Sequence, residues 1–158
     1  MGTIVNMGRQ KEMSSMYDRE QTLVDDFMVS LGQSHSSPWG PLDTATEFFY
    51  ARGRTDVVAR TTEGEIIAFE AKLTKWRDAV HQAYRNTCFA HRSYILLPEQ
   101  TAATAARYVG EFAKRSVGLC YMSDGQVVVA LEAPRVSPLQ SWLSDQATAI
   151  CLRNNNGQ

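Results

Sequence analysis

Three charged residues of this chain, Asp56, Glu70 and Lys72, are of the types that bind a hard metal ion and stabilise negative charge. Carboxylate oxygens are the ligands that Mg2+ prefers, and the ion usually completes its shell with waters and a substrate phosphate. A bound divalent ion lowers the pKa of a water molecule and offsets the charge that builds on a phosphate. An ammonium close to the ligands would stabilise that same charge. The set therefore suggests phosphodiester hydrolysis, provided that the fold brings the three side chains together.

Two short runs of β-branched and apolar residues carry these side chains, at 55–60 and 65–73. We predict a β-hairpin with a three-residue loop that ends at Gly64, in the left-handed conformation that such loops favour. Thr61 then pairs with Glu65, and the rest of the register follows from that pair.

In this register Asp56 falls directly opposite Glu70, and strand alternation places Lys72 on the same face as Glu70. Two facing carboxylates repel each other by about 0.2–1 kcal/mol when solvated, and by more when they are shielded from water. A fold that retains such a pair is expected to hold a divalent cation there.

Hydrophobic periodicity and turn residues predict the remaining elements. Residues 139–152 could form a further short amphipathic helix, which either caps the core or joins two subunits in a homodimer. The other predicted helices cover 17–31, 75–89 and 101–115, and the other strands cover 47–52, 93–98, 117–122 and 126–131.

The order of these elements, α-β-β-β-α-β-α-β-β, predicts an α/β (α+β) fold with a central mixed sheet flanked by helices. The continuous apolar run at 93–98 is typical of a strand at the centre of such a sheet. We expect a single domain over residues 16–153, with a flexible N-terminus at 1–15 and a flexible tail at 154–158.

Asp56 followed by Glu70-Ala71-Lys72 at the end of an apolar strand resembles the PD-(D/E)XK (restriction-endonuclease-like) nuclease superfamily. The resemblance extends through residues 76–86 and 89–98, because members often follow the lysine with a helix that carries glutamine and then with a buried strand. It covers roughly residues 17–131, and its specific part is 54–98.

Two positions depart from the pattern of that superfamily. Thr55 stands where the motif is named for proline, a common loss among members. Some members have tyrosine four residues after the glutamine, whereas this chain has Gln82 and Asn86. The second departure weakens assignment to an exonuclease-like subgroup and leaves the predicted metal centre untouched.

The resemblance implies a restriction-endonuclease-like core and a metal-dependent nuclease that acts on DNA. The implied metal is Mg2+, with Mn2+ as a substitute. Asp56, Glu70 and the backbone carbonyl of Ala71 would hold it, and Lys72 would be the catalytic cation.

Two further polar residues have an ordinary interpretation beside the functional one. The resemblance makes Glu20 an additional acid near the metal, and the alternative is a first-turn acid favoured by the helix dipole. Gln82 lies on the flank of the predicted helix, where it would contact a phosphate or a water on the metal. A polar residue at the boundary of the core is the alternative for Gln82.

The charge of the chain neither requires nor excludes a nucleic-acid partner. The net charge is −1 over 158 residues, which is not the strongly basic balance of many nucleic-acid-binding proteins. Residues 50–92 are different, with eight basic residues against five acidic ones. Metal binding would neutralise two of those acids and leave a locally positive surface for phosphates.

Composition limits the other classes of function. Three widely spaced cysteines without a Cys-x-x-Cys pair favour a reducing cytoplasm over a disulfide framework. Residues 1–15 lack the apolar core of a secretory signal, and we expect no membrane span. Two alternatives to a nuclease stay open, namely a nuclease-derived module that binds nucleic acid without cutting it and a structural domain without a nucleic-acid partner.

Overall fold

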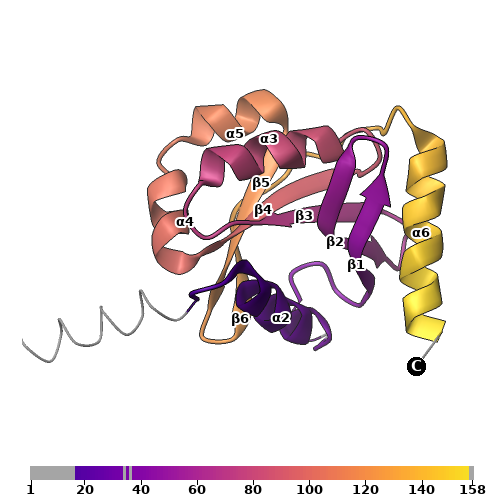
Figure 1. Cartoon of the computed structure of the whole chain (residues 1–158), viewed down its shortest axis with the longest axis horizontal. Coiled ribbons are helices and arrows are strands. Elements are labelled where there is room, and N and C mark those ends of the chain that lie inside the picture. Colours follow the sequence, from indigo (N-terminus) through magenta and orange to yellow (C-terminus); the bar gives the residue numbers. More distant parts are fainter. Residues whose placement is uncertain (1–16, 34, 36, 157–158) are drawn as a thin grey trace, which may run out of the picture.

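The computed structural model describes residues 17–33, 35 and 37–156, and Figure 1 shows how their elements are arranged. Six strands form one sheet in the order of the chain. Pairing is parallel between β3, β4 and β5 and antiparallel elsewhere, so the predicted mixed sheet is confirmed. The strands are β1 (Leu42–Tyr50), β2 (Gly53–Thr61), β3 (Ile66–Ala71), β4 (Arg92–Pro98), β5 (Val117–Ser123) and β6 (Gln126–Leu131).

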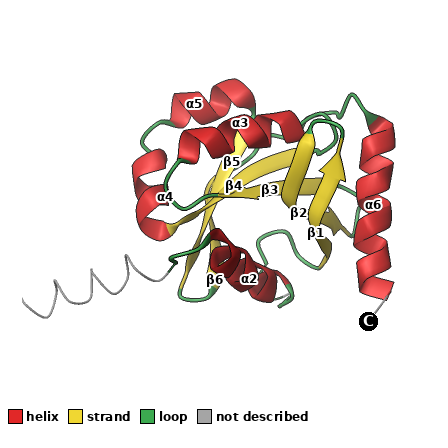
Figure 2. Cartoon of the chain, viewed as in Figure 1, coloured by secondary structure: helices red, strands yellow, loops and turns green. Residues whose placement is uncertain are grey.

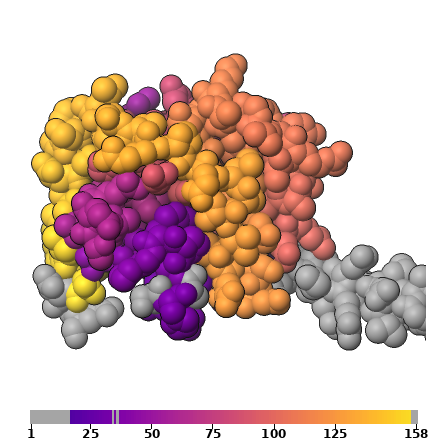
Figure 3. Space-filling model, turned by 180° about the vertical axis from the view of Figure 1, so that it is seen from behind, coloured from indigo at the N-terminus to yellow at the C-terminus, as the bar shows by residue number. Residues whose placement is uncertain are grey.

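Helices flank the sheet on both faces (Figure 2). Helix α2 (Glu20–Leu31) packs on one face, and the other helices pack on the opposite face. Seen from behind, the yellow helix α6 lies at one end of the molecule and the coral region around α4 lies at the other (Figure 3). The helices on the opposite face are α3 (Trp76–Asn86), α4 (Glu99–Ala105), α5 (Val109–Arg115) and α6 (Ser141–Asn156).

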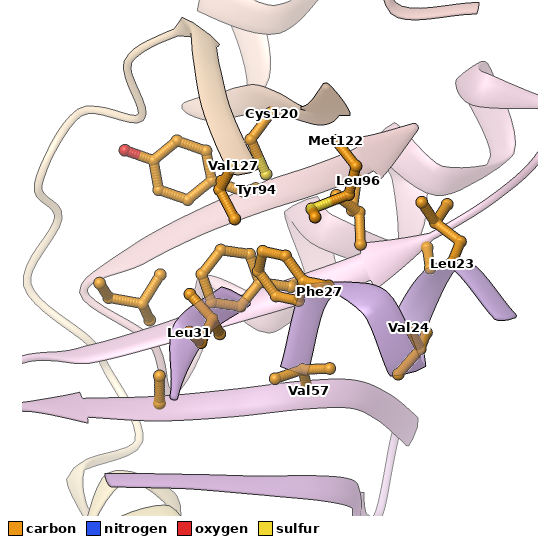
Figure 4. Close-up of a cluster of buried hydrophobic side chains, with 14 of the residues drawn as sticks. Leu23, Val24, Phe27, Leu31, Val57, Tyr94, Leu96, Cys120, Met122 and Val127 are labelled. Atoms are coloured by element: carbon orange, nitrogen blue, oxygen red, sulfur yellow. The ribbon is translucent and has the colours of Figure 1, made fainter. Parts of the chain in front are cut away.

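The apolar stripe of α2 forms the first part of the core (Figure 4). Phe27 is fully buried and packs edge-on against Phe69 of β3, with ring centroids 4.7 Å apart. Burial of each large apolar side chain contributes about 1.5–3 kcal/mol, so this stripe holds the helix against the sheet. The start of α2 is thereby fixed near the end of β3. The stripe consists of Leu23, Val24, Phe27 and Leu31.

Helix α3 packs on the opposite face through small residues. Ala79 and Ala83 are fully buried and allow the helix to approach β4 closely. Trp76 opens the helix and stacks on Phe112 of α5 at 5.6 Å. This packing directs the flank of α3 that carries Gln82 toward the end of β3.

The predicted helix over 101–115 is wrong, because the structure has two shorter helices there. Helix α4 begins directly after Pro98 and ends at Ala105, and α5 begins at Val109. The break places Tyr108 against the Trp76 ring, with centroids 5.4 Å apart. Helix propensity favours one continuous helix, but Tyr108 has the non-helical backbone angles φ −108° and ψ 49° and separates α4 from α5.

Other boundaries also differ from the predictions. Strand β1 begins at Leu42 rather than at residue 47, because its backbone pairs with β2 as far as Thr61. The C-terminal helix exists, but it extends to Asn156 and so includes residues predicted as flexible tail. It packs on β1 and β2, which supports the capping role. The predicted flexible N-terminus at 1–15 lies outside the described residues.

Candidate active site

The β2–β3 hairpin has the predicted register. Gly64 adopts a φ of +89°, and the Thr61 N–H donates to the Glu65 carbonyl at 2.9 Å. Val58 pairs with Ala68, so the same register places Asp56 and Glu70 across from each other. The loop length and the strand period of two residues are therefore enough to predict this pair.

Asp56 lies where the regular pairing of β2 with β3 ends. The last backbone pair of this ladder toward the site is Val57 with Phe69. In a regular ladder the Ala71 N–H would next donate to the backbone of Thr55. The Asp56 side chain replaces that acceptor, because its Oδ2 accepts the Ala71 N–H at 2.9 Å. The main chain of β3 therefore fixes the Asp56 carboxylate.

Glu70 is an almost fully buried carboxylate, with 3% of its surface exposed. Its Oε1 accepts a hydrogen bond of 2.9 Å from the Asn86 side-chain amide. Burial, and next the negative charge of Asp56, raise the pKa of Glu70 to about 8, although the Asn86 hydrogen bond acts in the opposite direction. A carboxyl with this pKa marks a place where added positive charge would be stabilising.

A pocket of about 140 Å3 lies at the end of β3, bordered by residues of α2 and α3. It brings together every side chain that the sequence predicted for the site. Strand β3 ends at Ala71, so strict alternation does not extend to Lys72, but Lys72 and Glu70 line the same pocket. The pocket is lined by Glu20, Gln21, Val24, Arg54, Asp56, Glu70, Ala71, Lys72 and Gln82.

Both cations of the pocket, Lys72 and Arg54, are in ion pairs. The Lys72 Nζ lies 3.8 Å from the Glu20 carboxylate, and both side chains are partly exposed. The Arg54 guanidinium donates to Asp56 Oδ1 at 3.2 Å. Such exposed pairs contribute about 0–1 kcal/mol each, so either cation could exchange its partner for a substrate phosphate at little cost.

Sequence patterns assign no role to three residues that shape the site. Asn86 stands out in the sequence only as a departure from a motif, yet it contacts Glu70. Arg54 lines the pocket, and Glu47 lies 3.5 Å from it with a left-handed φ of +57° on β1. The sequence offers one signal for Asn86, namely that it lies one helical turn after Gln82 and therefore on the same flank of the helix. No local signal marks Arg54 or Glu47.

The donor set fits a hard divalent cation. Within 17–33, 35 and 37–156, no group of three or more His, Cys, Asp or Glu side chains is arranged to hold a metal. Mg2+ needs fewer protein ligands, because it is usually bound through one or two carboxylates together with waters and substrate phosphates. Asp56 and Glu70 supply such a pair, and a cation between them would offset their repulsion. Ala71 lines the same pocket, and its carbonyl as a ligand stays a prediction.

None of the helices in the described part of the chain has both the length and the apolar character that crossing a bilayer requires.

Comparisons with known proteins show a shared fold and no family. No protein-family model and no curated protein sequence matches this chain. SPO1766, a protein of unknown function from Silicibacter pomeroyi, has a similar structure, with a TM-score of 0.56 and 20% identity over 90% of this chain and 97% of that chain. At this identity the likeness concerns the fold alone.

Two further solved structures match less well. The Ca2+ complex of SfsA from Pyrococcus furiosus has a TM-score of 0.32 and 12% identity, over 58% of this chain and 55% of that chain. A repair endonuclease from Pyrococcus abyssi has a TM-score of 0.42 and 16% identity, over 75% of this chain and 49% of that chain. Both scores are too low to carry an argument about this protein.

Proposed function

We propose that this protein is a metal-dependent nuclease that hydrolyses phosphodiester bonds, with DNA as the expected substrate. The observation that carries the proposal is the buried Glu70 carboxylate beside Asp56, in one pocket with Lys72. A structural hairpin would leave such acids in water or replace one of them, because burial of two neighbouring carboxylates is unfavourable. The resemblance of Asp56 and Glu70-Ala71-Lys72 to the PD-(D/E)XK superfamily supports the same conclusion.

Asp56, Glu70 and the Ala71 carbonyl would hold Mg2+ or Mn2+, with Glu20 as a further acid that lines the same pocket. A divalent cation there would neutralise charge on the scissile phosphate and lower the pKa of a coordinated water. Glu20 forms an ion pair with Lys72, so its first role is to orient the lysine ammonium group.

The other side chains of the pocket would act directly on the substrate. Lys72 would donate to a phosphate oxygen whose negative charge increases in the transition state. Arg54 would leave Asp56 to contact a second phosphate oxygen or the next phosphate along the strand. The Gln82 amide lines the same pocket, where it would orient the phosphate or the attacking water.

Cleavage of labelled DNA and RNA tests this proposal. Wild-type protein with Mg2+ or Mn2+ should cut DNA, and chelator should abolish cutting. Binding to DNA in Ca2+ without cleavage in Mg2+ or Mn2+ would indicate the alternative, a module that recognises nucleic acid without cutting it. Neither binding nor cleavage would favour a structural domain and would overturn the proposal.

A further inference from the structure

We propose that Asn86 is a positioning residue that holds the Glu70 carboxylate ready for a divalent cation, and that Tyr50 and Thr55 fix the Asn86 amide for this task. This inference rests on the metal dependence proposed above. It adds three residues, from β1, β2 and α3, to the machinery of the site.

Asn86 is a buried polar side chain, and both its amide nitrogen and its amide oxygen form hydrogen bonds. It lies in the last turn of α3, and only 1% of its surface is exposed. Its Nδ2 donates to Glu70 Oε1 at 2.9 Å. A buried amide without partners would cost free energy, so this geometry is maintained only because each polar atom of Asn86 finds a partner.

Two hydroxyl groups determine which way the amide points. The Tyr50 hydroxyl donates to Asn86 Oδ1 at 2.8 Å, and the Thr55 hydroxyl donates to the same oxygen at 2.9 Å. A carbonyl oxygen has two lone pairs, so these two donors satisfy it. Burial raises the pKa of Tyr50 to about 12, and the phenol therefore keeps the proton that it donates. The NH2 group of Asn86 is left to face Glu70.

The orientation of the amide matters because a carboxylate can only accept hydrogen bonds when it is ionised. A reversed Asn86 amide would point its oxygen at Glu70 and repel the ionised form that binds a metal. In the observed orientation the amide anchors Oε1, which restricts rotation of the carboxylate and leaves Oε2 for the cation. Anchoring of this kind reduces the ordering cost of metal binding.

The network also connects the two expected ligands. Thr55 immediately precedes Asp56 on β2, whereas Glu70 lies on β3, and Asn86 is hydrogen-bonded to both Thr55 and Glu70. Thr55 is fully buried, so its hydroxyl has a fixed environment. A shift of Asn86 would therefore alter the position of both carboxylates relative to each other.

The test is the dissociation constant for Mn2+, measured without nucleic acid by electron paramagnetic resonance of the free ion. Asn86→Leu keeps the side-chain size and removes the donor to Glu70. Partners of metal ligands typically change affinity by about 10- to 100-fold, and this variant should bind Mn2+ more weakly by that factor. The double variant Tyr50→Phe/Thr55→Val leaves Asn86 in place but frees its amide to reverse. The affinity of this double variant for Mn2+ should fall by a smaller factor, about three- to tenfold.

The matched control is Tyr94→Phe/Thr61→Val, which makes the same chemical changes away from the pocket. Tyr94 donates its hydroxyl to Glu132, and Thr61 accepts from the Glu65 N–H. The control should retain wild-type affinity for Mn2+ even where its melting temperature falls. If Asn86→Leu does not fold, the Tyr50→Phe/Thr55→Val double variant still decides the question.

Two outcomes would overturn the inference, and they are distinguishable. Wild-type affinity in the folded variants, with only melting temperatures changed, would make the network purely structural and leave the proposed function standing. Failure of the wild-type protein to bind Mn2+ would overturn both the inference and the metal-dependent function.

Discussion

The Asp56 carboxylate stands in for a strand carbonyl, because its Oδ2 accepts the Ala71 N–H at 2.9 Å where the β2–β3 ladder ends. The same hydrogen bond keeps Asp56 beside the buried Glu70. The negative charge of Asp56 helps to raise the pKa of Glu70. The hairpin thus uses a main-chain donor to stabilise a side-chain arrangement that charge alone would disfavour. The stability of the metal-free protein should reflect this arrangement.

Asp56→Asn should stabilise the metal-free protein at pH 9. The asparagine oxygen can still accept from Ala71, while one negative charge beside the ionised Glu70 is removed. We expect a gain of about 1 kcal/mol in the free energy of unfolding at pH 9, and a smaller gain at pH 6, where Glu70 is protonated. Denaturant unfolding in chelator at both pH values measures the difference.

The same variant tests whether Asp56 is a metal ligand. Wild-type protein should gain about 2.7 kcal/mol at a Mn2+ concentration of a hundred times its dissociation constant, and Asp56→Asn should gain much less. Asp43→Asn is the control, because it also loses an ion pair, with Arg60, but lies at the other end of β1 and β2. Equal metal-induced shifts in Asp56→Asn and wild type would show that Asp56 is not a ligand.

Lys72→Ala should separate catalysis from metal binding. The lysine is expected to serve the transition state, so cleavage should slow by about 10²–10³-fold while Mn2+ affinity stays close to wild type. Single-turnover cleavage and direct metal titration measure the two effects. Lys114→Ala removes an exposed lysine of α5 that lies outside the pocket, so this control should cut normally. Cleavage by Lys72→Ala at the wild-type rate would remove Lys72 from the mechanism.

The pH dependence of stability should identify Glu70. Its pKa in the folded protein is about 8, above the ordinary value of 4.5, so between these values the folded state binds more protons than the unfolded state. Stability of the metal-free protein should therefore decrease as the pH rises from 5 to 8. Glu70→Gln cannot titrate, and subtraction of its unfolding profile from that of wild type should isolate this decrease. Parallel profiles would contradict the assignment.

Arg54 should contribute to binding of the substrate backbone. With Ca2+ in place of Mg2+ to slow cleavage, Arg54→Ala should weaken DNA binding and lower the slope of log affinity against log salt by about one. Fluorescence anisotropy at several salt concentrations measures both quantities. Arg153→Ala, on the exposed side of α6, should leave affinity and slope unchanged. An unchanged slope in Arg54→Ala would mean that Arg54 does not contact a phosphate.

Residues close in sequence determined the centre of the site. The three-residue loop and the strand period specify the register of the hairpin, and that register by itself places Asp56 opposite Glu70. Such a prediction works because the length and turn type of a hairpin loop fix the register of the two strands that it joins. The mixed sheet followed similarly from the order of elements.

Contacts between distant segments decided the surroundings of these carboxylates. The hydrogen bond from Asn86 to Glu70 and the ion pair between Lys72 and Glu20 each join elements whose separation the sequence does not specify. The break between α4 and α5 likewise brings Tyr108 against Trp76, a contact between segments that are distant in the sequence. Periodicity specifies which face of an element is buried, whereas the partner across that face depends on how helices pack on the sheet. Sequence alone therefore determined the pair of acids, and only tertiary packing determined what holds them in place.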